Sequence, residues 1–391
     1  MLSVMKKIAV VVVAYNRSDT LERLLRSLSS ATYGEDVCLI ISIDKSDVKE
    51  VTEIASKYVW NHGEKRIIQH NERLGLRRHV LSVGNLLNEF EAVIVLEDDV
   101  IVAKNFYLFA KACVEKYYDA QNIAGISLYN FSINYQTLQA FLPMKNGYDV
   151  YFMQTAQSWG QVWMRAQWKE FTDWYQKQEN TFSQTPHLPR TICSWPETSW
   201  LKYHTKYCIE TNKYFVYPYL SYSSNCGNSG THRRYSSPLF RTATMTEAWK
   251  EPSFPPSFED AVSYDAFFEN TALHQYLAIS KEDLCIDLNR QKQNRTNKRY
   301  WLTSEHANYK VLKRFGLSFR PIDLNIIENC EGEGIYLYDT SIEEKNKDLQ
   351  AKRELFEYES HTDILHLLKR LREYGIWSVV RLYLSSLLKK K

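Results

Sequence analysis

The sequence predicts an α/β fold in which a mostly parallel sheet is flanked by helices. Three short apolar runs rich in β-branched residues, at residues 8–14, 37–43 and 92–96, have the length and composition of buried strands. Segments with the apolar spacing of helices, at residues 19–30 and 80–90, separate these runs. Strands that alternate with helices usually pair in parallel, and helices then cover both faces of the sheet.

Each of these runs is followed by polar residues. The first leads into Tyr-Asn-Arg-Ser-Asp, the second into Asp-Lys-Ser-Asp at residues 44–47, and the third into Glu97, Asp98 and Asp99. Ligands of such sheets bind outside the carboxyl ends of the strands. We therefore expect the functional site at this edge of the sheet.

The chain divides into three predicted parts. Residues 1–235 form the α/β domain, and residues 236–360 form an accessory or acceptor-side region that begins near the extended stretch EPSFPPSFED. Residues 361–391 form a basic amphipathic helix. We expect the whole extension after the α/β domain to be mainly helical.

Composition excludes several classes of protein. With 391 residues and 44% hydrophobic content the chain is neither disordered nor fibrous, and a net charge of +3 is too balanced for a nucleic-acid binder. Seven scattered cysteines without a C-x-x-C pair indicate reduced thiols. No apolar run reaches 18 residues, so we expect a cytoplasmic protein, or one bound peripherally to the inner face of the cell membrane.

The adjacent carboxylates Glu97, Asp98 and Asp99 repel one another unless a cation lies between them. Carboxylates at a strand end suit Mn²⁺ or Mg²⁺, which complete their ligand shells with water and substrate phosphates. If the strand continues through these residues, Glu97 and Asp99 share one face and Asp98 lies on the other. The alternative is a solvated acidic turn without a ligand.

Several motifs occur together and in a fixed order. They are VVVVAYNRSDTLERLLRSL, LIISIDKSD, GLRRHVLSVGNLLNEF, AVIVLEDDVIVAKNFYLFAKACVEKY and SWGQVWMRAQWKEF. In this order they resemble the N-acetylglucosaminyltransferase I family, including the related protein O-mannose enzymes, and bacterial glycosyltransferases of the Rossmann-like GT-A fold. The resemblance covers residues 8–171 well and residues 195–232 loosely.

The resemblance implies a nucleotide-sugar donor that is bound through a divalent metal, and a UDP-sugar is the expected donor. It makes Arg17, Asp44 and His79 nucleotide contacts, with Asp44 at the uracil edge. It makes Asp99 the metal ligand, Asp98 a ribose-side group and Glu97 a donor-sugar contact. A metal bridging the phosphates would stabilise the negative charge that grows on the leaving group.

An inverting transfer also needs a carboxylate that takes the proton from the acceptor hydroxyl. By comparison with the bacterial relatives, Glu197 in SWPETSW is the expected base. Glu stands there in place of the relatives' Asp. Asp173 in WKEFTDWY is the second choice, although its segment reads as an amphipathic helix in which an Asp is usually only solvated.

Two further sets of residues are candidates for the donor site. His232 ends the loop GNSGTH, and by resemblance it is a metal or diphosphate ligand, with Arg233 and Arg234 beside it to neutralise phosphate charge. Trp159 and Trp163 either stack on a sugar ring or fill the core. Trp159 is the better site candidate because Gly160 leaves room beside it.

The C-terminal residues 361–391 carry seven Lys or Arg against Asp363 and Glu373, a net charge of 7 − 2 = +5. Ile376, Val380, Leu384 and Leu387 recur at helical spacing before three lysines. Such a helix can lie in the interface of an anionic membrane. The alternative is a helix docked on the protein itself or on a second subunit.

Together these features predict a metal-dependent, inverting glycosyltransferase that moves a sugar from a UDP-sugar to a glycan. By resemblance, UDP-N-acetylglucosamine is the first candidate for the donor. A membrane-bound tail would favour a lipid-linked glycan of bacterial surface polysaccharide synthesis as the acceptor. Two alternatives stay open. One is a sugar nucleotidyltransferase, although the loop after the first strand lacks the Gly-rich sequence of such enzymes. The other is a catalytically silent glycan-binding or scaffold protein with the same fold.

Overall fold

The computed structural model describes residues 7–178, 182–183, 185–227, 238–246, 248–293, 298–346, 352–373, 375–377 and 380–381. Its largest element is a nine-stranded sheet with the order β11-β7-β9-β6-β8-β4-β1-β2-β3. Five of the eight neighbouring pairs are parallel and three are antiparallel. The predicted fold class, a mostly parallel sheet flanked by helices, is confirmed.

The parallel half of the sheet forms where the sequence predicts it. Its first strand, β1 (Ile8–Ala14), is buried along its whole length because alternate residues enter two separate cores. Val10 and Val12 pack on one face of the sheet, and Val11 and Val13 pack on the other. The other elements of this half are α1 (Ser18–Ser29), β2 (Cys38–Ile43), α2 (Lys49–Lys57), β3 (Lys65–Gln69), α3 (Gly75–Val83), the 3₁₀ helix η1 (Gly84–Asn88) and β4 (Ala92–Glu97).

The second half of the sheet mixes parallel and antiparallel pairs. It contains α4 (Phe106–Tyr117), β6 (Ile123–Ser127), β7 (Val150–Met153), β8 (Gln161–Met164), α5 (Arg165–Tyr175), α6 (Arg190–Cys193), α7 (Leu201–Glu210) and β9 (Tyr214–Pro218). A two-stranded ribbon pairs β5 (Val100–Val102) with β10 (Ser223–Asn225). The edge strand β11 (Ser263–Tyr264) pairs with β7, so the sheet extends past the predicted boundary at residue 235.

The extension after the sheet is not mainly helical, and this prediction is wrong. A four-stranded sheet with the order β12-β13-β15-β14 has its own core, which includes Leu302, Phe315 and Leu337. A run of aromatic and β-branched residues in β15 favours a strand over a helix. The elements are α8 (Leu273–Tyr276), β12 (Leu284–Asp287), β13 (Tyr300–Thr303), β14 (Tyr309–Phe315), α9 (Asp323–Ile327) and β15 (Ile335–Glu343).

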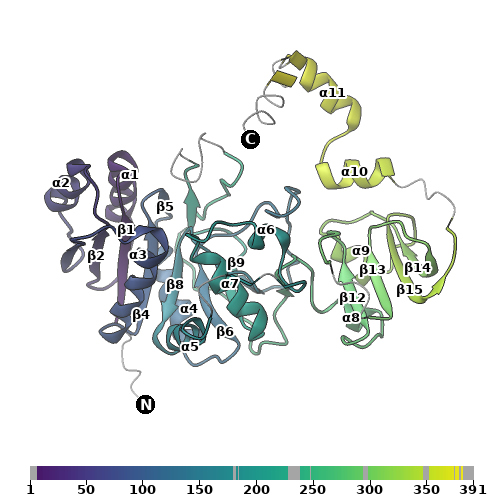
Figure 1. Ribbon diagram of the computed structural model, residues 1–391, viewed down its shortest axis with the longest axis horizontal. Helices are drawn as coiled ribbons and strands as arrows, with labels where there is room; N and C mark the ends of the chain where they lie inside the picture. Colours follow the sequence, from purple (N-terminus) through teal and green to yellow (C-terminus); the bar gives the residue numbers. More distant parts are fainter. Residues whose placement is uncertain are drawn as a thin grey trace.

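Two helices follow the small sheet, α10 (Lys352–Ser360) and α11 (Ile364–Glu373), and α11 projects from the rest of the molecule (Figure 1). Within the described ranges, no helix is long and apolar enough to cross a membrane. The end of the predicted tail helix, from residue 382 to the C-terminus, lies outside the described residues.

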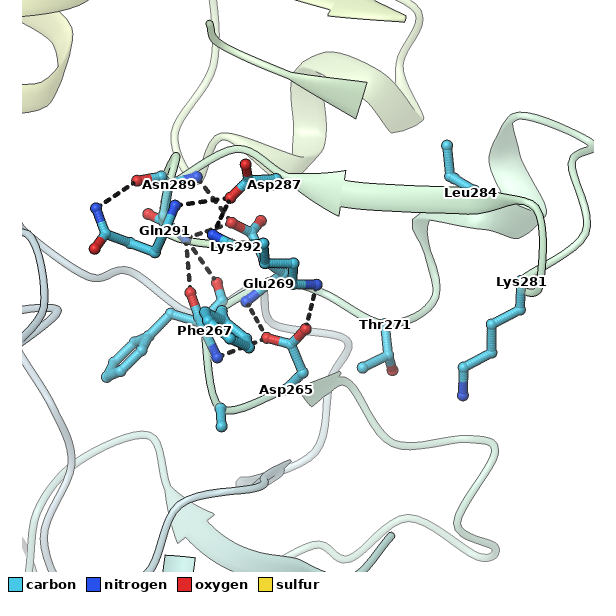
Figure 2. Close-up of polar contacts among 12 residues, drawn as sticks. Asp265, Phe267, Glu269, Thr271, Lys281, Leu284, Asp287, Asn289, Gln291 and Lys292 are labelled. Carbon is cyan, nitrogen blue, oxygen red and sulfur yellow. Dashed lines mark hydrogen bonds and ion pairs between the residues drawn. The ribbon is translucent and has the colours of Figure 1, made fainter. Parts of the chain in front are cut away.

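The two sheets are joined by a cluster of polar residues, which Figure 2 shows. We call Asp265, Glu269, Asp287 and Lys292 the junction cluster. The Lys292 ammonium lies 2.6 Å from the Asp265 carboxylate, whose Oδ1 accepts hydrogen bonds from two backbone amides of its own loop. Glu269 accepts the backbone N–H of Asn289 at 2.8 Å. The loop before α8 is therefore fastened to the loop after β12.

Candidate functional site

A cavity of about 760 Å³ opens at the carboxyl ends of β1, β2 and β4. This is the edge of the sheet at which the sequence predicts the site. The cavity brings together seven of the predicted site residues, namely Arg17, Asp44, His79, Glu97, Asp98, Asp99 and Trp159.

Glu97, Asp98 and Asp99, which we call the acidic triplet, lie at the carboxyl end of β4. Glu97 is the last residue of the strand, and Asp98 and Asp99 form the turn that leads into β5. Since the strand ends at Glu97, the expectation that Asp98 lies on the opposite face is wrong, and all three side chains line the cavity. The Arg17 guanidinium bridges the two aspartates, with a hydrogen bond to Asp98 Oδ1 and another of 3.0 Å to Asp99 Oδ2.

Burial opposes the ionisation of Glu97 and Asp98. It raises the pKa of Glu97 to about 8, with further increases from Asp99 and Asp98, while Arg17 and a hydrogen bond from Trp200 oppose the shift. Burial also raises the pKa of Asp98 to about 6, against the attraction of Arg17. Four carboxylates and two arginines line the cavity, a charge of −4 + 2 = −2 when all are ionised. A diphosphate would therefore be repelled unless a cation enters with it.

One oxygen atom of the acidic triplet is available to bind such a cation. Asp99 Oδ1 is shielded from solvent and has no hydrogen-bond partner among the described residues. Those residues contain no group of three or more His, Cys, Asp or Glu side chains that could hold a metal by themselves. The chain therefore fits a hard divalent cation that takes one carboxylate from the protein and most of its ligands from water and phosphate.

Asp44 and His79 form the wall of the cavity next to β2. The Asp44 carboxylate accepts backbone N–H groups from Lys45 and Leu74 on Oδ1, at 2.9 and 2.7 Å, and from Gly75 on Oδ2, at 2.9 Å. These hydrogen bonds fix the first residue of α3. Oδ2 accepts only one of them and can therefore accept another hydrogen bond. His79 Nε2 lies 2.8 Å from Ser42 Oγ, and burial lowers the pKa of its imidazole to about 4. A neutral ring and an anchored carboxylate suit a polar, uncharged part of a ligand.

The two tryptophan candidates have different environments. Trp159 is half-buried and lines the cavity beside Ser158. Trp163 is buried in the core, where its ring stacks on Trp168 at 4.0 Å. Of the pair, Trp159 alone is therefore placed where it can contact a ligand.

Neither of the two candidate bases lines the cavity, but Glu197 lies next to residues that do. Glu197 does not line the cavity itself, but its neighbours Trp195, Pro196 and Ser199 do. Lys202 Nζ donates to its Oε1 at 2.7 Å and the Tyr203 hydroxyl donates to its Oε2 at 3.1 Å. The hydrogen bond from Lys202 is the main cause of a lowered Glu197 pKa, so this carboxylate is ionised at neutral pH.

Asp173 lies on α5 and is paired with Lys169 in the same helix, at 2.6 Å. It is about half exposed and does not line the cavity. His232, Arg233 and Arg234 lie outside the described residues.

Several cavity residues are absent from the sequence-based prediction. Arg73, Tyr15, Trp195, Trp200 and Asn225 all line it, and the Arg73 guanidinium lies 5.0 Å from the centre of the Tyr15 ring. The two tryptophans that flank Glu197 in SWPETSW were a signal for this wall. Nothing in the local sequence pointed to Asn225.

A comparison with protein families gives a match for the first part of the chain. Residues 6–118 match the model of a family described as "Glycosyltransferase like family 2". This segment carries β1 to α4, and with them all the acidic residues that line the cavity. The predicted resemblance to a glycosyltransferase domain is confirmed at this level, and the closer resemblance to N-acetylglucosaminyltransferase I stays a prediction.

Similar solved structures include residues 1–349 of TarS from S. aureus, with 13% identity and a TM-score of 0.37, over 56% of this chain and 59% of that chain. A mannosyltransferase from Pyrobaculum calidifontis, in complex with GDP-Man and Mn²⁺, matches with 13% identity and a TM-score of 0.34, over 56% and 58%. GalNAc-T7 with UDP, GalNAc and Mn²⁺ matches with 15% identity and a TM-score of 0.35, over 56% and 43%. This chain thus spans less than two thirds of each of these chains. No curated protein matches it.

Proposed function

We propose that the protein is a metal-dependent, inverting glycosyltransferase that uses a UDP-sugar, with UDP-N-acetylglucosamine the first candidate. The observation that carries this proposal is the cavity at the carboxyl ends of β1, β2 and β4, lined by the acidic triplet and Arg17. The match of residues 6–118 to a glycosyltransferase family supports it.

In this proposal the chain holds the two ends of the donor differently. The uncharged His79 and the anchored Asp44 carboxylate accept the nucleoside, since Oδ2 of Asp44 can receive an N–H from the base. Arg17 faces the diphosphate, Asp98 the ribose and Glu97 the sugar. Asp99, through its unpartnered Oδ1, holds Mn²⁺ or Mg²⁺. When bound, the cation neutralises the charge that develops on the departing diphosphate.

Glu197 is the proposed general base. Its ionised carboxylate takes the proton from the acceptor hydroxyl while the acceptor oxygen attacks the anomeric carbon and the bond to the diphosphate breaks. Lys202 is almost fully buried and fixes the Glu197 carboxylate through one oxygen. A carboxylate with a lowered pKa is a weak base but is fully available at neutral pH.

We propose a glycan as the acceptor, and a lipid-linked glycan of bacterial surface polysaccharide synthesis as its specific form. The protein would then act in the cytoplasm, peripherally on the inner face of the cell membrane. The sequence-based argument for this acceptor is the basic C-terminal tail, whose net charge is +5 by the count above.

The test of the base uses two matched variants and needs no known acceptor. Many glycosyltransferases slowly hydrolyse their donor, so UDP release from a panel of UDP-sugars with Mn²⁺ identifies the donor first. Glu197→Gln should then lower hydrolysis and transfer at least about 100-fold and leave UDP affinity unchanged. Asp173→Asn is the control and should change neither. Full activity in Glu197→Gln, or its loss in Asp173→Asn, would contradict the assignment.

A further inference from the structure

The last described part of the chain is an unpacked amphipathic segment. We call residues 364–373, 375–377 and 380–381 the C-terminal arm. None of the side chains of α11 is buried, and Leu365 and Leu368 are 69% and 55% exposed. Trp377, just after the helix, is 83% exposed. Large apolar side chains in such number are rarely left in water on one short segment without a partner.

The apolar residues of α11 share one side of the helix. At 100° per residue, Ile364, Leu365, Leu367, Leu368 and Leu371 fall within one sector. Lys369 and Arg370 lie outside this sector, and Arg372 lies within it, between Leu368 and Leu365. This arrangement combines an apolar face with flanking positive charge, the pattern of helices that lie in a membrane interface.

The arm is attached firmly at its base. In α10, Leu355 is buried in the core of the small sheet, and the Arg320 guanidinium lies 4.0 Å from the centre of the Tyr358 ring. Arg320 Nη1 also lies 2.7 Å from Nε2 of His361, between the two helices. The arm therefore begins from a fixed point on the protein.

We propose that the C-terminal arm binds the interface of an anionic lipid bilayer, with the leucine face and Trp377 among the acyl chains and the basic residues at the headgroups. A membrane fits better than a protein groove because the exposed apolar face is combined with a net charge of +5 over residues 361–391. Tryptophan is also the residue most typical of the membrane–water boundary.

A bilayer bound by the arm would bring a lipid-linked acceptor close to the protein; this part alone rests on the proposed function.

The experiment is co-sedimentation of the full chain with vesicles of phosphatidylcholine, with or without an equal part of phosphatidylglycerol. We expect binding to the anionic vesicles and little to the neutral ones. The double variant Leu365→Gln, Leu368→Gln keeps helix-forming side chains and should lower binding at least about tenfold. Leu312→Gln, on the exposed face of β14, is the matched control and should bind like the wild type.

Two results would overturn the proposal. The first is equal vesicle binding by the double variant. The second is a dimer in solution that the double variant dissociates, because the leucine face would then pack on a second copy. UDP titration of the same proteins separates this proposal from the enzymatic one. A chain that binds vesicles but not UDP would support membrane binding by the arm and contradict the proposed transferase activity.

Discussion

The chain gathers three carboxylates around a basic side chain in two places, and the two groups differ in what surrounds them. In the cavity, Arg17 bridges Asp98 and Asp99, and Oδ1 of Asp99 has no partner among the described residues. In the junction cluster, Lys292 pairs with Asp265, whose Oδ1 is saturated by backbone amides (Figure 2). The first group faces a cavity of about 760 Å³ and the second fastens two loops.

The difference shows that an acidic cluster is identified as a ligand site by its access to a large cavity. Neither its charge nor a single unpartnered oxygen is sufficient, because Oε2 of Glu269 in the junction cluster also has no hydrogen-bond partner among the described residues. The same substitution should therefore affect activity in one cluster and stability in the other. The predictions below use this contrast, from the largest expected effect to the smallest.

Asp99→Asn removes the carboxylate that is proposed to hold the cation. We expect metal-dependent hydrolysis of the UDP-sugar to fall about 100-fold or more, since charge on the leaving group loses its stabilisation. The measurement is UDP release per folded molecule. Asp265→Asn is the same change in the junction cluster and should leave this rate as it is. If both variants lose activity equally, the two clusters are not functionally distinct.

Lys292→Met breaks the ion pair of the junction cluster and leaves Asp265 without its cation. Because removal of Lys292 leaves a partly buried carboxylate without its counter-charge, the free energy of unfolding should fall by about 2 kcal/mol, between the values for exposed and buried pairs. Urea unfolding measures this value. Arg17→Met, the corresponding change in the cavity, should weaken UDP binding, whereas Lys292→Met should leave UDP binding unchanged. Weaker UDP binding by Lys292→Met would contradict the comparison.

Glu269→Gln tests the protonation of the junction cluster. Burial raises the pKa of Glu269 to about 8, opposed by Lys292 and reinforced by Asp287 and Asp265. The folded state then binds a proton that the unfolded state, with a pKa of about 4.3, releases. Wild-type stability should fall as pH rises from about 4.3 to about 8. The Gln variant should therefore exceed the wild type by more than about 1 kcal/mol at pH 8.5 and match it near pH 5. Urea unfolding curves of the wild type and the Gln variant at the two pH values measure this difference in stability.

His204→Phe is expected to have the smallest effect. His204 is buried, stacks on Phe171 at 4.1 Å, and neither ring nitrogen has a partner among the described residues. Burial lowers its pKa to about 3, so it costs stability as pH falls from about 6.5 to about 3. Phe should raise stability by up to about 1 kcal/mol at pH 5 and change little at pH 8. A loss of stability at both pH values would mean that an imidazole N–H makes a contact that matters.

The sequence was most informative where one local pattern decides the structure. The strand at Ile8–Ala14 and the acidic residues after β4 follow from a continuous apolar run and its abrupt polar end. The small sheet was missed because its strands β12 and β13 are short and lie between irregular loops. The strand β14 was missed because its polar residues Lys310, Lys313 and Arg314 do not alternate regularly with apolar ones.

The details of the site depend on contacts between residues far apart in sequence. The Arg17 bridge to Asp98 spans 81 residues, and the amides of Leu74 and Gly75 reach Asp44 across 30 and 31 residues. No local pattern reports such pairs. The prediction therefore named seven of the residues that line the cavity and missed others, such as Arg73 and Asn225. It could not tell that Asp44 is held by backbone amides or that Asp98 faces the cavity.

The most direct test of the central claim is a calorimetric titration of UDP into the full chain, with and without Mn²⁺, for the wild type and Asp99→Asn. We expect Mn²⁺ to raise the affinity of the wild type at least about tenfold and to have no effect on the variant. Two results would contradict the claim that the acidic triplet forms a metal-dependent donor site. The first is that the wild type does not bind UDP under either condition, and the second is that its affinity for UDP is the same with and without Mn²⁺.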